Sequence, residues 1–389
     1  MKIFISAGEP SGDIHGCNLA ASLQKMHPGI EISGFGGPKM RSAGVDLLYP
    51  LAEHAVIGFI QVARMYGFFV ERVKQAADWF EAEKPDAVVL IDYPGMNWWV
   101  ARRATERGIP VYYFVPPQIW AWGGWRVGKM KRYVNEAFAN FPFENDWYSE
   151  RGMPNTWVGH PYFDELAGQQ IDQPFVEAIR GSGKTVIGML PGSRTQELEN
   201  NVPSMLRAAC RLNKQHPGLE FHFACLKEKQ KVWVTQKIAS KPEWAALPVT
   251  VHAGKTPEII EVSRFCIAVS GSVSLELLWR KKPCVTIYHA AWFYIQLAKV
   301  LKRCRYASLV NLLAGKELSP EFVHYRCRSR QIARVCHQWL KEPETLNKVV
   351  EELTDLRETW AIPGACERAA RLLLERVAAP SSRPARSVA

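Results

Sequence analysis

The chain has 389 residues and a formal net charge of +11, with 47% hydrophobic and 22% charged residues. This length fits one or two domains, and the composition is that of an ordinary globular protein, not of a disordered chain. An uncharged apolar run of about 18 residues is missing, so no transmembrane helix is predicted, and the short apolar start before Glu9 and Pro10 is typical of a strand, not of a signal peptide.

The nine cysteines show no CxxC spacing, which argues against a disulfide framework or a zinc site. Reduced thiols of a cytosolic protein are therefore expected. The positive charge favours phosphates, nucleic acid or an anionic membrane as partners, and charge alone does not choose among them. Several of the 14 Trp lie beside Lys or Arg, which suits a membrane–water interface as well as ordinary core packing.

In the first half of the chain, short apolar runs alternate with helical patterns, which predicts βαβ units and a parallel sheet. The predicted strands are Lys2–Ser6, Ile30–Gly34, Ala87–Ile91, Val111–Val115 and Glu136–Asn140. The predicted helices are Leu19–His27, Val70–Lys84 and Trp98–Arg107. This half is predicted to form a Rossmann-like domain over residues 1–166.

A glycine-rich stretch at 167–184 is predicted to be a linker, after which the alternation restarts. The strands predicted there are Thr185–Leu190, Glu220–Ala224, Val249–Ala253, Phe265–Val269 and Cys284–Tyr288. The helices are Pro203–Gln215, Thr256–Val262 and Val273–Trp279. A second Rossmann-like domain is expected over 185–345, followed by C-terminal helices over 346–377 that could pack back on the first domain. The Pro-, Ser-, Ala- and Arg-rich end, 378–389, is predicted to be disordered.

Two segments follow predicted strands of the first half, at the edge where α/β sheets bind ligands. The glycines of Ser6–Asp13 (SAGEPSGD) allow close approach of a ligand to a helix start, or they form a plain βα turn. This segment does not match the GxGxxG fingerprint of nicotinamide-binding folds. In Ile91–Asn97, Asp92 is well placed for a general base, or it forms a turn before Pro94.

Aromatic and basic residues are interleaved in three places. Val115–Trp122 precedes Arg126, Lys129, Lys131 and Arg132, a pattern that fits a phosphorylated sugar with apolar chains, or else a solvated basic helix. The stretches 64–74 and 290–306 are typical of amphipathic segments on an anionic membrane, or of buried helix faces. The candidate membrane or acyl-chain contacts are Met65, Tyr66, Phe68, Phe69, Trp292 and Phe293.

In the second half, two segments offer donors to a diphosphate. The turn in Leu190–Arg194 exposes backbone N–H groups beside the guanidinium of Arg194, although a solvated turn is the alternative. In Ser270–Glu276, the glycine and serines can present donors at a helix start, and Glu276 can accept from ribose hydroxyls; an N-terminal capping box is the alternative. The candidate donor-binding residues are Gly192, Ser193, Arg194, Ser270, Gly271, Ser272, Ser274 and Glu276.

Nine fragments occur together in one order, and together they resemble the lipid-A-disaccharide synthase family over most of the chain. The fragments are Ala7–Asp13, Gly34–Met40, Ile91–Asn97, Trp120–Trp122, Phe141–Glu144, Val158–Pro161, Leu190–Arg194, Ser270–Glu276 and Asn311–Gly315. The resemblance implies an α/β GT-B fold with two Rossmann-like domains facing across a central cleft. It implies an inverting transfer from UDP-2,3-diacylglucosamine to 2,3-diacylglucosamine 1-phosphate, which gives the β-1,6-linked lipid A disaccharide 1-phosphate and UDP.

The resemblance also implies roles for the site residues, with no metal and no cofactor. Asp92 would take the proton from the acceptor hydroxyl, the donor-binding residues would hold UDP, and Arg126 or Lys129 would meet the acceptor phosphate. Acceptor or sugar contacts are expected from Gly8, Glu9, Ser11, Gly12, Asp13, Asn97, Gln118, Trp120, Arg126, Lys129 and Asn311. The family usually has different residues at Gln61, Gly95, Pro116 and Gly123, all on the acceptor side.

The expected partners are the UDP-sugar donor, the sugar-phosphate acceptor and the anionic inner membrane, without nucleic acid; a homodimer is an option. The expected location is cytoplasmic and peripheral, on the inner face of the cytoplasmic membrane of a Gram-negative-type bacterium. Two alternative enzymes share this architecture: a UDP-N-acetylglucosamine 2-epimerase, and the lipid-linked sugar transferase, whose Gly-Gly-His loop is missing here. A basic peripheral membrane or nucleic-acid binder is the non-enzymatic alternative, although no nucleic-acid-binding signature is found.

Overall fold

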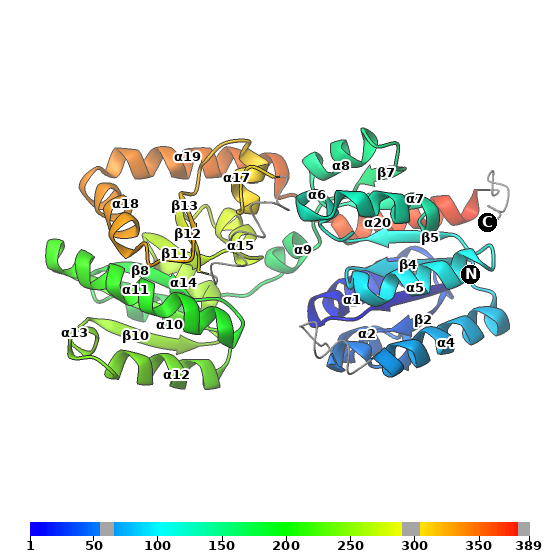
Figure 1. Ribbon diagram of the computed structural model, residues 1–389, viewed down its shortest axis with the longest axis horizontal. Coiled ribbons are helices and arrows are strands. Elements are labelled where there is room, and N and C mark those ends of the chain that lie inside the picture. Colours follow the sequence, from blue (N-terminus) through cyan, green and yellow to red (C-terminus); the bar gives the residue numbers. More distant parts are fainter. Residues whose placement is uncertain (55–65, 290–303, 380–389) are drawn as a thin grey trace. The chain divides into compact units, whose positions relative to one another are not determined.

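The computed structural model describes residues 1–54, 66–289 and 304–379 (Figure 1), and the chain divides into two compact units. Unit 1 contains Met1–Asp164 and Ile362–Ala389, and unit 2 contains Glu165–Ala361. Each unit holds one parallel β-sheet with helices on both faces. The prediction of two Rossmann-like α/β halves is confirmed.

The sheet of unit 1 has seven parallel strands in the order β3-β2-β1-β4-β5-β6-β7. Their bounds are β1 (Lys2–Ala7), β2 (Glu31–Phe35), β3 (Asp46–Tyr49), β4 (Ala87–Ile91), β5 (Val111–Phe114), β6 (Glu136–Ala139) and β7 (Asn155–Trp157). The five strands predicted for this half are confirmed to within two residues at each end. The two edge strands, β3 and β7, are short and were not predicted.

Successive residues of β1 point to opposite faces of this sheet, as the pleat requires. Ile3 and Ile5 belong to the core under α1 and α20, whereas Phe4 belongs to the core under α4 and α5. The helical segments of unit 1 are α1 (Pro10–Met26), α2 (Pro38–Ser42), η1 (Leu51–His54), α4 (Tyr66–Glu83), α5 (Pro94–Thr105), α6 (Ile119–Trp122), η2 (Gly124–Arg126), α7 (Val127–Tyr133), α8 (Pro142–Ser149) and α20 (Ala365–Ala378). A further helix, α9 (Tyr162–Ala167), crosses the division between the units.

The sheet of unit 2 has six parallel strands in the order β10-β9-β8-β11-β12-β13. Their bounds are β8 (Thr185–Leu190), β9 (Leu219–Cys225), β10 (Val249–Ala253), β11 (Phe265–Val269), β12 (Cys284–His289) and β13 (Glu321–His324). The helices are α10 (Gln173–Arg180), α11 (Thr195–Gln215), α12 (Glu228–Ala239), α13 (Pro242–Ala245), α14 (Thr256–Val262), α15 (Val273–Trp279), α17 (Leu309–Ala314), α18 (Ser329–Lys341) and α19 (Pro343–Trp360). The five predicted strands are confirmed, and β13 was not predicted.

Both sheets reverse their strand order once. In unit 1 the chain runs outward from β1 to β3 and then returns to place β4 on the other side of β1. In unit 2 it runs from β8 to β10 and returns to place β11 beside β8. At such a reversal the loops that follow the two central strands diverge, which leaves a crevice at the carboxyl ends of the strands. Each unit therefore has one favoured position for a ligand.

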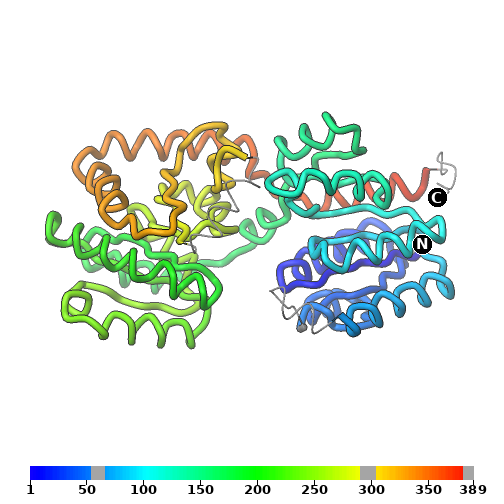
Figure 2. The backbone as a smooth tube through the Cα atoms, in the orientation of Figure 1, coloured from blue at the N-terminus to red at the C-terminus, as the bar shows by residue number. Residues whose placement is uncertain are grey.

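The end of the chain returns to unit 1 after α19 has packed on unit 2 (Figure 2). Helix α20 lies against α1, and its first backbone N–H groups donate to the carboxylate of Asp164. Farther along, Arg376 forms an ion pair with Glu136 of β6 at 2.7 Å. In the described ranges 1–54, 66–289 and 304–379, none of the helices has the length and apolar character that a membrane crossing requires.

Candidate functional site

The turn after β4 carries Asp92 in a backbone conformation that L-residues rarely adopt. Asp92 has φ of 42° and Tyr93 has φ of 48°, so two successive non-glycine residues are left-handed. The carbonyl oxygen of Asp92 accepts hydrogen bonds from Asn97 Nδ2 and from the Tyr113 hydroxyl, each at 2.7 Å. Such strain persists only where surrounding contacts hold it, and it is concentrated at functional sites.

Asn97 connects this turn to the first strand of the unit. Its side chain is fully buried, and its Oδ1 accepts a 2.7 Å hydrogen bond from the Ser6 hydroxyl. Its Nδ2 faces the carbonyl oxygens of Ser6, Ile91 and Asp92. The amide therefore joins the carboxyl ends of β1 and β4 at the reversal of strand order, and it fixes where Asp92 lies.

The carboxyl group of Asp92 is suited to accept a proton. Partial burial raises its pKa above the ordinary value, while a hydrogen bond from the Tyr93 backbone and the charge of His15 act in the opposite direction. A carboxylate with a raised pKa is a stronger base than an ordinary aspartate. Behind it, burial and His15 lower the pKa of His160 to about 3, so His160 is neutral at physiological pH.

The loop Gly8–Asp13 forms the wall beside this turn. A Cβ atom on Gly8 would lie 2.1 Å from the Tyr93 ring, so only glycine fits there. The buried Asp13 carboxylate accepts from the backbone N–H groups of Gly37, Lys39 and Met40, which fixes the start of α2. In this loop the glycines and Asp13 support the edge, whereas Glu9 is partly exposed and Ser11 is exposed.

Trp120 and Glu144 form a buried pair behind the loop after β5. Trp120 is 7% exposed, and its Nε1 donates to Glu144 Oε1 at 3.1 Å. Glu144 is 1% exposed and also accepts from the Asn140 backbone at 2.7 Å. Burial raises the pKa of Glu144 to about 7, against the opposing effect of these hydrogen bonds. Sequence reasoning singled out Trp120 but not the carboxyl group that holds it.

The basic and aromatic residues that follow are at the surface. Gln118 and Lys129 are exposed, and the guanidinium of Arg126 lies over the Trp122 ring at 4.7 Å. The ring of Trp125, which is 68% exposed, lies 5.7 Å from the same guanidinium. A cation near two exposed indoles is available to an anionic ligand that also carries apolar groups.

Of the predicted membrane contacts, Tyr66 is 68% exposed, whereas Phe68 and Phe69 pack partly into the core under α4. Met65, Trp292 and Phe293, together with Gln61, lie outside the described residues. The other three departures from the family pattern differ in setting. Gly95 is exposed with open space around it, while Pro116 and Gly123 are buried.

In unit 2, the loop after β8 is held by two residues that sequence reasoning missed. Glu197 Oε2 accepts from the backbone N–H groups of Ser193 and Arg194, and Gln230 donates to the Ser193 carbonyl at 2.7 Å. Gly192 has φ of 103°, and a Cβ there would meet Glu197 at 2.5 Å. The side chain of Arg194 is 60% exposed and contacts Glu197 at 3.2 Å. Glu197 is the third residue of α11 and accepts from the N–H of the residue before the helix, which is one half of a capping box, whereas the Arg194 side chain has no acceptor to form the other half.

The loop after β11 exposes Gly271 and Ser272, while Ser274 turns inward and donates to the Gly271 carbonyl at 2.8 Å. No side-chain cap forms at Ser272, so the capping box weighed for this segment is not present. Glu276 is 4% exposed and lies 3.4 Å from Arg280. Its carboxylate is therefore held in one direction within the unit.

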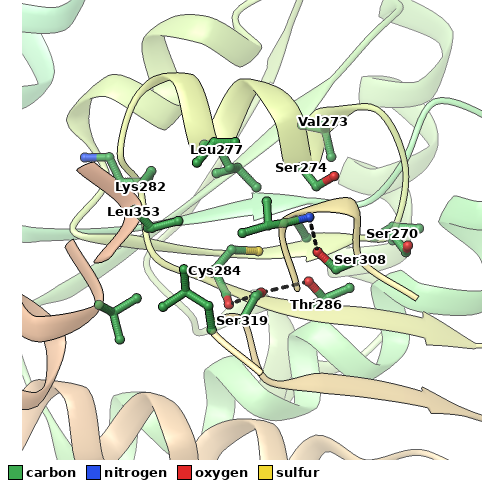
Figure 3. A pocket seen from close by; sticks show the side chains of 16 residues that line it. Ser270, Val273, Ser274, Leu277, Lys282, Cys284, Thr286, Ser308, Ser319 and Leu353 are labelled. Carbon is green, nitrogen blue, oxygen red and sulfur yellow. Dashed lines mark hydrogen bonds between the residues drawn. The ribbon is translucent and has the colours of Figure 1, made fainter. Parts of the chain in front are cut away.

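A small cavity lies directly beneath this loop (Figure 3). Ser270 and Ser274 are on its rim, and Thr286, Ser308 and Ser319 line its floor. The hydroxyls of Thr286 and Ser319 are 2.9 Å apart. The cavity has a volume of about 10 Å³, which is near the smallest space that holds one water. The residues that line the cavity support the loop, and the cavity itself is too small for a nucleotide.

Asn311, on the neighbouring α17, is fully buried and fully hydrogen-bonded. Its Nδ2 donates to the Ser319 carbonyl and to Glu321, and its Oδ1 accepts from the backbone N–H groups of Leu318 and Ser319. These four bonds use the whole capacity of the amide. In this structure Asn311 joins α17 to β13.

Comparison with known proteins gives a consistent result. A family model described as lipid-A-disaccharide synthetase matches residues 3–374. The chain is 33% identical to a lipid-A-disaccharide synthase of Trichlorobacter lovleyi, with 97% of each chain covered. It is 30% identical to lipid-A-disaccharide synthase 1 of Legionella pneumophila, with 92% of this chain and 93% of the relative covered.

Solved structures show the same fold at low identity. A UDP-GlcNAc 2-epimerase from Neisseria meningitidis, bound to UDP-GlcNAc, aligns with a TM-score of 0.66 at 15% identity, over 96% of this chain and all of the other. A sucrose-phosphate synthase from Thermosynechococcus elongatus aligns with a TM-score of 0.60 at 11% identity, over 96% of this chain and 98% of the other.

Proposed function

The chain belongs to the lipid-A-disaccharide synthase family, and from this premise we propose how its residues carry out the reaction. The enzyme transfers a diacylglucosamine unit from UDP to diacylglucosamine 1-phosphate, and it releases UDP and the disaccharide 1-phosphate. Each unit contributes one set of groups at its own strand reversal. Unit 1 supplies a carboxylate on a strained backbone turn, and unit 2 supplies donors suited to a diphosphate.

The observation that carries the proposal is the turn at Asp92. Two left-handed residues place the carboxylate at the reversal of the first sheet, and the Asn97 and Tyr113 side chains hold that turn. A purely structural turn has no need of this strain, which costs of order 1–3 kcal/mol per residue. We assign Asp92 as the general base that takes the proton from the acceptor 6-hydroxyl.

On the donor side, the loop after β8 presents the exposed Arg194 guanidinium, while the backbone N–H groups of Ser193 and Arg194 donate to Glu197. The loop after β11 adds the exposed Gly271 and Ser272. These groups would hold the UDP diphosphate as negative charge develops on it, an interaction that stabilises the transition state most when the donors are already in place. Glu276, held by Arg280, would accept from the ribose hydroxyls.

The acceptor phosphate would meet Arg126, which lies near two exposed indoles, together with Lys129. Acyl chains would rest near Trp122, Trp125 and Tyr66, which are about half exposed or more. An enzyme with a lipid acceptor has to reach a membrane, so we propose peripheral docking on the cytoplasmic face of the inner membrane. The +11 net charge favours such an anionic surface.

The epimerase alternative finds no support beyond the fold, because the matching epimerase is only 15% identical. The relatives at 30–33% identity are disaccharide synthases. A binding protein without activity would not need strained backbone beneath a carboxylate with a raised pKa. The transferase reading explains these features together.

The first prediction tests the base. Asp92→Ala should reduce disaccharide formation by about 10²–10⁴-fold, because an aligned base contributes a factor of that size. Product is measured by mass spectrometry after incubation with UDP-diacylglucosamine and the acceptor monosaccharide. Asp92→Asn serves as the isosteric variant, since it keeps the shape of the side chain and removes the base.

UDP affinity, measured by calorimetry, is the control for this pair of variants. Both should bind UDP as the wild type does, because the proposed donor groups belong to unit 2. Wild-type turnover in Asp92→Asn would remove Asp92 from the mechanism. Lost UDP binding in both variants would show instead that Asp92 acts on the donor.

A further inference from the structure

A basic pocket lies between α11 and α18 in unit 2, away from the loops already described. It has a volume of about 320 Å³ and is lined by Arg211, Lys214, Arg330, Arg334 and His337. The four Lys and Arg residues are exposed, and in the described part of the chain none of them has an ion-pair partner. Pockets of this volume accommodate small ligands.

The topology separates this pocket from the donor-binding loops. Helix α11 starts just after the Gly192–Arg194 loop, and its 21 residues carry the chain about 32 Å back toward the amino ends of the strands. Arg211 and Lys214 lie at the far end of this helix, only a few residues before β9 begins. The pocket is thus at the opposite end of α11 from the proposed diphosphate site.

Helix stability does not account for the cations of α18. The helix begins at Ser329 and has no acidic residue in its first turn, whereas Arg330 and Arg334 occupy its first two turns. Positive charges near the positive end of a helix dipole are unfavourable. Only Lys214, in the last turn of α11, lies at a helix end where the helix dipole favours a cation. Arg330 therefore occupies an unfavourable position in the first turn, and Arg334 faces the same pocket one turn later, so a bound anion would offset the repulsion there.

Other titratable groups near the pocket do not neutralise it. His216 and His337 share a hydrogen bond of 2.8 Å, and burial together with the charge of His337 lowers the pKa of His216. Glu243 of α13 acts on Cys210, which Lys214 and Arg211 also influence, but in the described residues it forms no ion pair with either cation, and Glu342 accepts from Gln338 at the end of α18. The guanidinium and ammonium groups therefore set the charge of the pocket at neutral pH.

We infer that the pocket between α11 and α18 is a second phosphate-binding site, separate from the donor site, that takes a phosphate or diphosphate group. Arg330 and Arg334 would bind the phosphate oxygens through paired N–H donors, and Arg211 and Lys214 would add charge from the facing helix. The phosphate can come from a free anion or from the headgroup of an anionic lipid. Both sources present the same oxygens to the pocket.

The test is calorimetry with inorganic pyrophosphate on the full-length protein with UDP present at saturation, so that the donor site is filled. The wild type should still bind pyrophosphate. Arg330→Gln/Arg334→Gln should bind it about tenfold more weakly or worse, since two charge-assisted contacts are lost. Lys229→Gln/Lys237→Gln on α12 makes the same change in net charge and should stay within about twofold of the wild type. Arg334→Lys, which keeps the charge but loses the paired donors, should bind pyrophosphate more weakly than the wild type and more tightly than the double variant.

Co-sedimentation with phosphatidylglycerol–phosphatidylcholine vesicles distinguishes the two sources. If lipid headgroups fill the pocket, the double arginine variant should lose vesicle binding that the α12 variant retains. If free phosphate fills it, the two variants should sediment alike and differ only toward pyrophosphate. The inference is overturned if the double arginine variant matches the α12 variant in both assays. None of these measurements uses the acceptor, so a failed transferase assay leaves this result intact.

Discussion

At the scale of single residues, the structure separates groups that reach the surface of the site from groups that hold others in place. Asp92 and Arg194 are accessible. In contrast, Asn97, Glu197 and Asn311 form hydrogen bonds with other groups of the chain. Sequence motifs do not make this distinction, because a positioning residue recurs in a motif for the same reason as a binding residue. The hydrogen-bond partners and the burial of each side chain in the structure do distinguish positioning residues from binding residues.

Arg194 and its neighbour Glu197 give the second prediction. Arg194→Ala should weaken UDP binding by about tenfold or more, because a charge-assisted contact to the diphosphate is lost. Glu197→Gln should have a smaller effect in the same direction, since the amide still offers one acceptor to the N–H groups of Ser193 and Arg194. Calorimetric titration with UDP measures both. Lys229→Ala, an exposed cation on α12, is the control, and equal losses in all three variants would contradict the assignment.

Glu144 gives the third prediction, on the pH dependence of stability. Burial raises its pKa from 4.5 to about 7, so between these values the folded protein keeps a proton that the unfolded chain releases. The unfolding free energy should therefore fall as pH rises from about 4.5 to 7. Glu144→Gln cannot titrate, so its unfolding free energy should lack this decline.

Urea unfolding across this pH range measures the difference, with Glu150→Gln on the exposed end of α8 as the control. The Tyr148 and Tyr113 hydroxyls and the Trp120 N–H face the same buried region from α8, β5 and α6. A wild type and a Glu144→Gln variant with parallel pH profiles would show that the Glu144 carboxyl ionises at its ordinary pKa.

At the scale of elements, strand positions could be predicted from the sequence because buried parallel strands are continuous apolar runs. Helix starts could be predicted only in part, because α14 and α15 begin at the predicted Thr256 and Val273 but longer helices begin earlier than predicted. Helix α1 begins at Pro10, nine residues before its predicted start at Leu19, since its first turns carry Gly, Ser and His toward the strand ends. Helix α11 begins at Thr195, eight residues before its predicted start at Pro203, which lies inside the helix.

The candidate site was predictable in part for the same reason. Loops after buried strands were identified, but contacts made across the sheet were not. Nothing in the local pattern of Asn97 indicates that it bonds Ser6, which is 91 residues away. Nor does the local pattern of Trp120 indicate that Glu144 holds it. Such pairings depend on strand order, which an apolar pattern does not specify.

The fourth prediction concerns the β1–α1 turn as an element. Gly8→Ala would drive a methyl group into the Tyr93 ring, where the Cβ would lie 2.1 Å from Cδ1. We expect a loss of about 1–3 kcal/mol in stability, typical of overpacking, and a large loss of transfer, because Tyr93 follows the proposed base. Thermal unfolding and the product assay measure the two effects.

Gly95→Ala, in the first turn of α5, is the matched control. A Cβ there meets nothing within 4 Å. Replacing glycine by alanine in a helix should then raise stability by up to about 1 kcal/mol and leave transfer unchanged. If both variants behaved alike, the close fit of Gly8 under Tyr93 would not matter for function.

At the scale of the whole molecule, the two units are built alike but completed differently. Unit 2 is continuous in sequence, whereas unit 1 takes its last helix from the far end of the chain. Helix α20 covers Ile3 and Ile5 through Cys366, Ala369 and Leu373, which are buried. The N-terminal half alone would leave these apolar faces exposed, so the unit that carries Asp92 requires the end of the chain for its stability.

The fifth prediction follows from how α20 is held. Asp164 accepts from the backbone N–H groups of Gly364, Ala365 and Cys366 at the start of this helix. Asp164→Ala should cost about 0.5–2 kcal/mol, the range for a lost helix cap, and it should loosen unit 1 locally. Asp172, which caps α10 by accepting from Phe175, offers the same substitution within unit 2.

Hydrogen exchange read by mass spectrometry should show faster exchange in α20 and α1 for Asp164→Ala, and in α10 for Asp172→Ala. UDP should slow exchange in unit 2 of both variants, since a ligand stabilises the folded state to which it binds. Faster exchange in α10 for Asp164→Ala, with α20 unchanged, would mean that the terminal helix does not depend on this carboxylate.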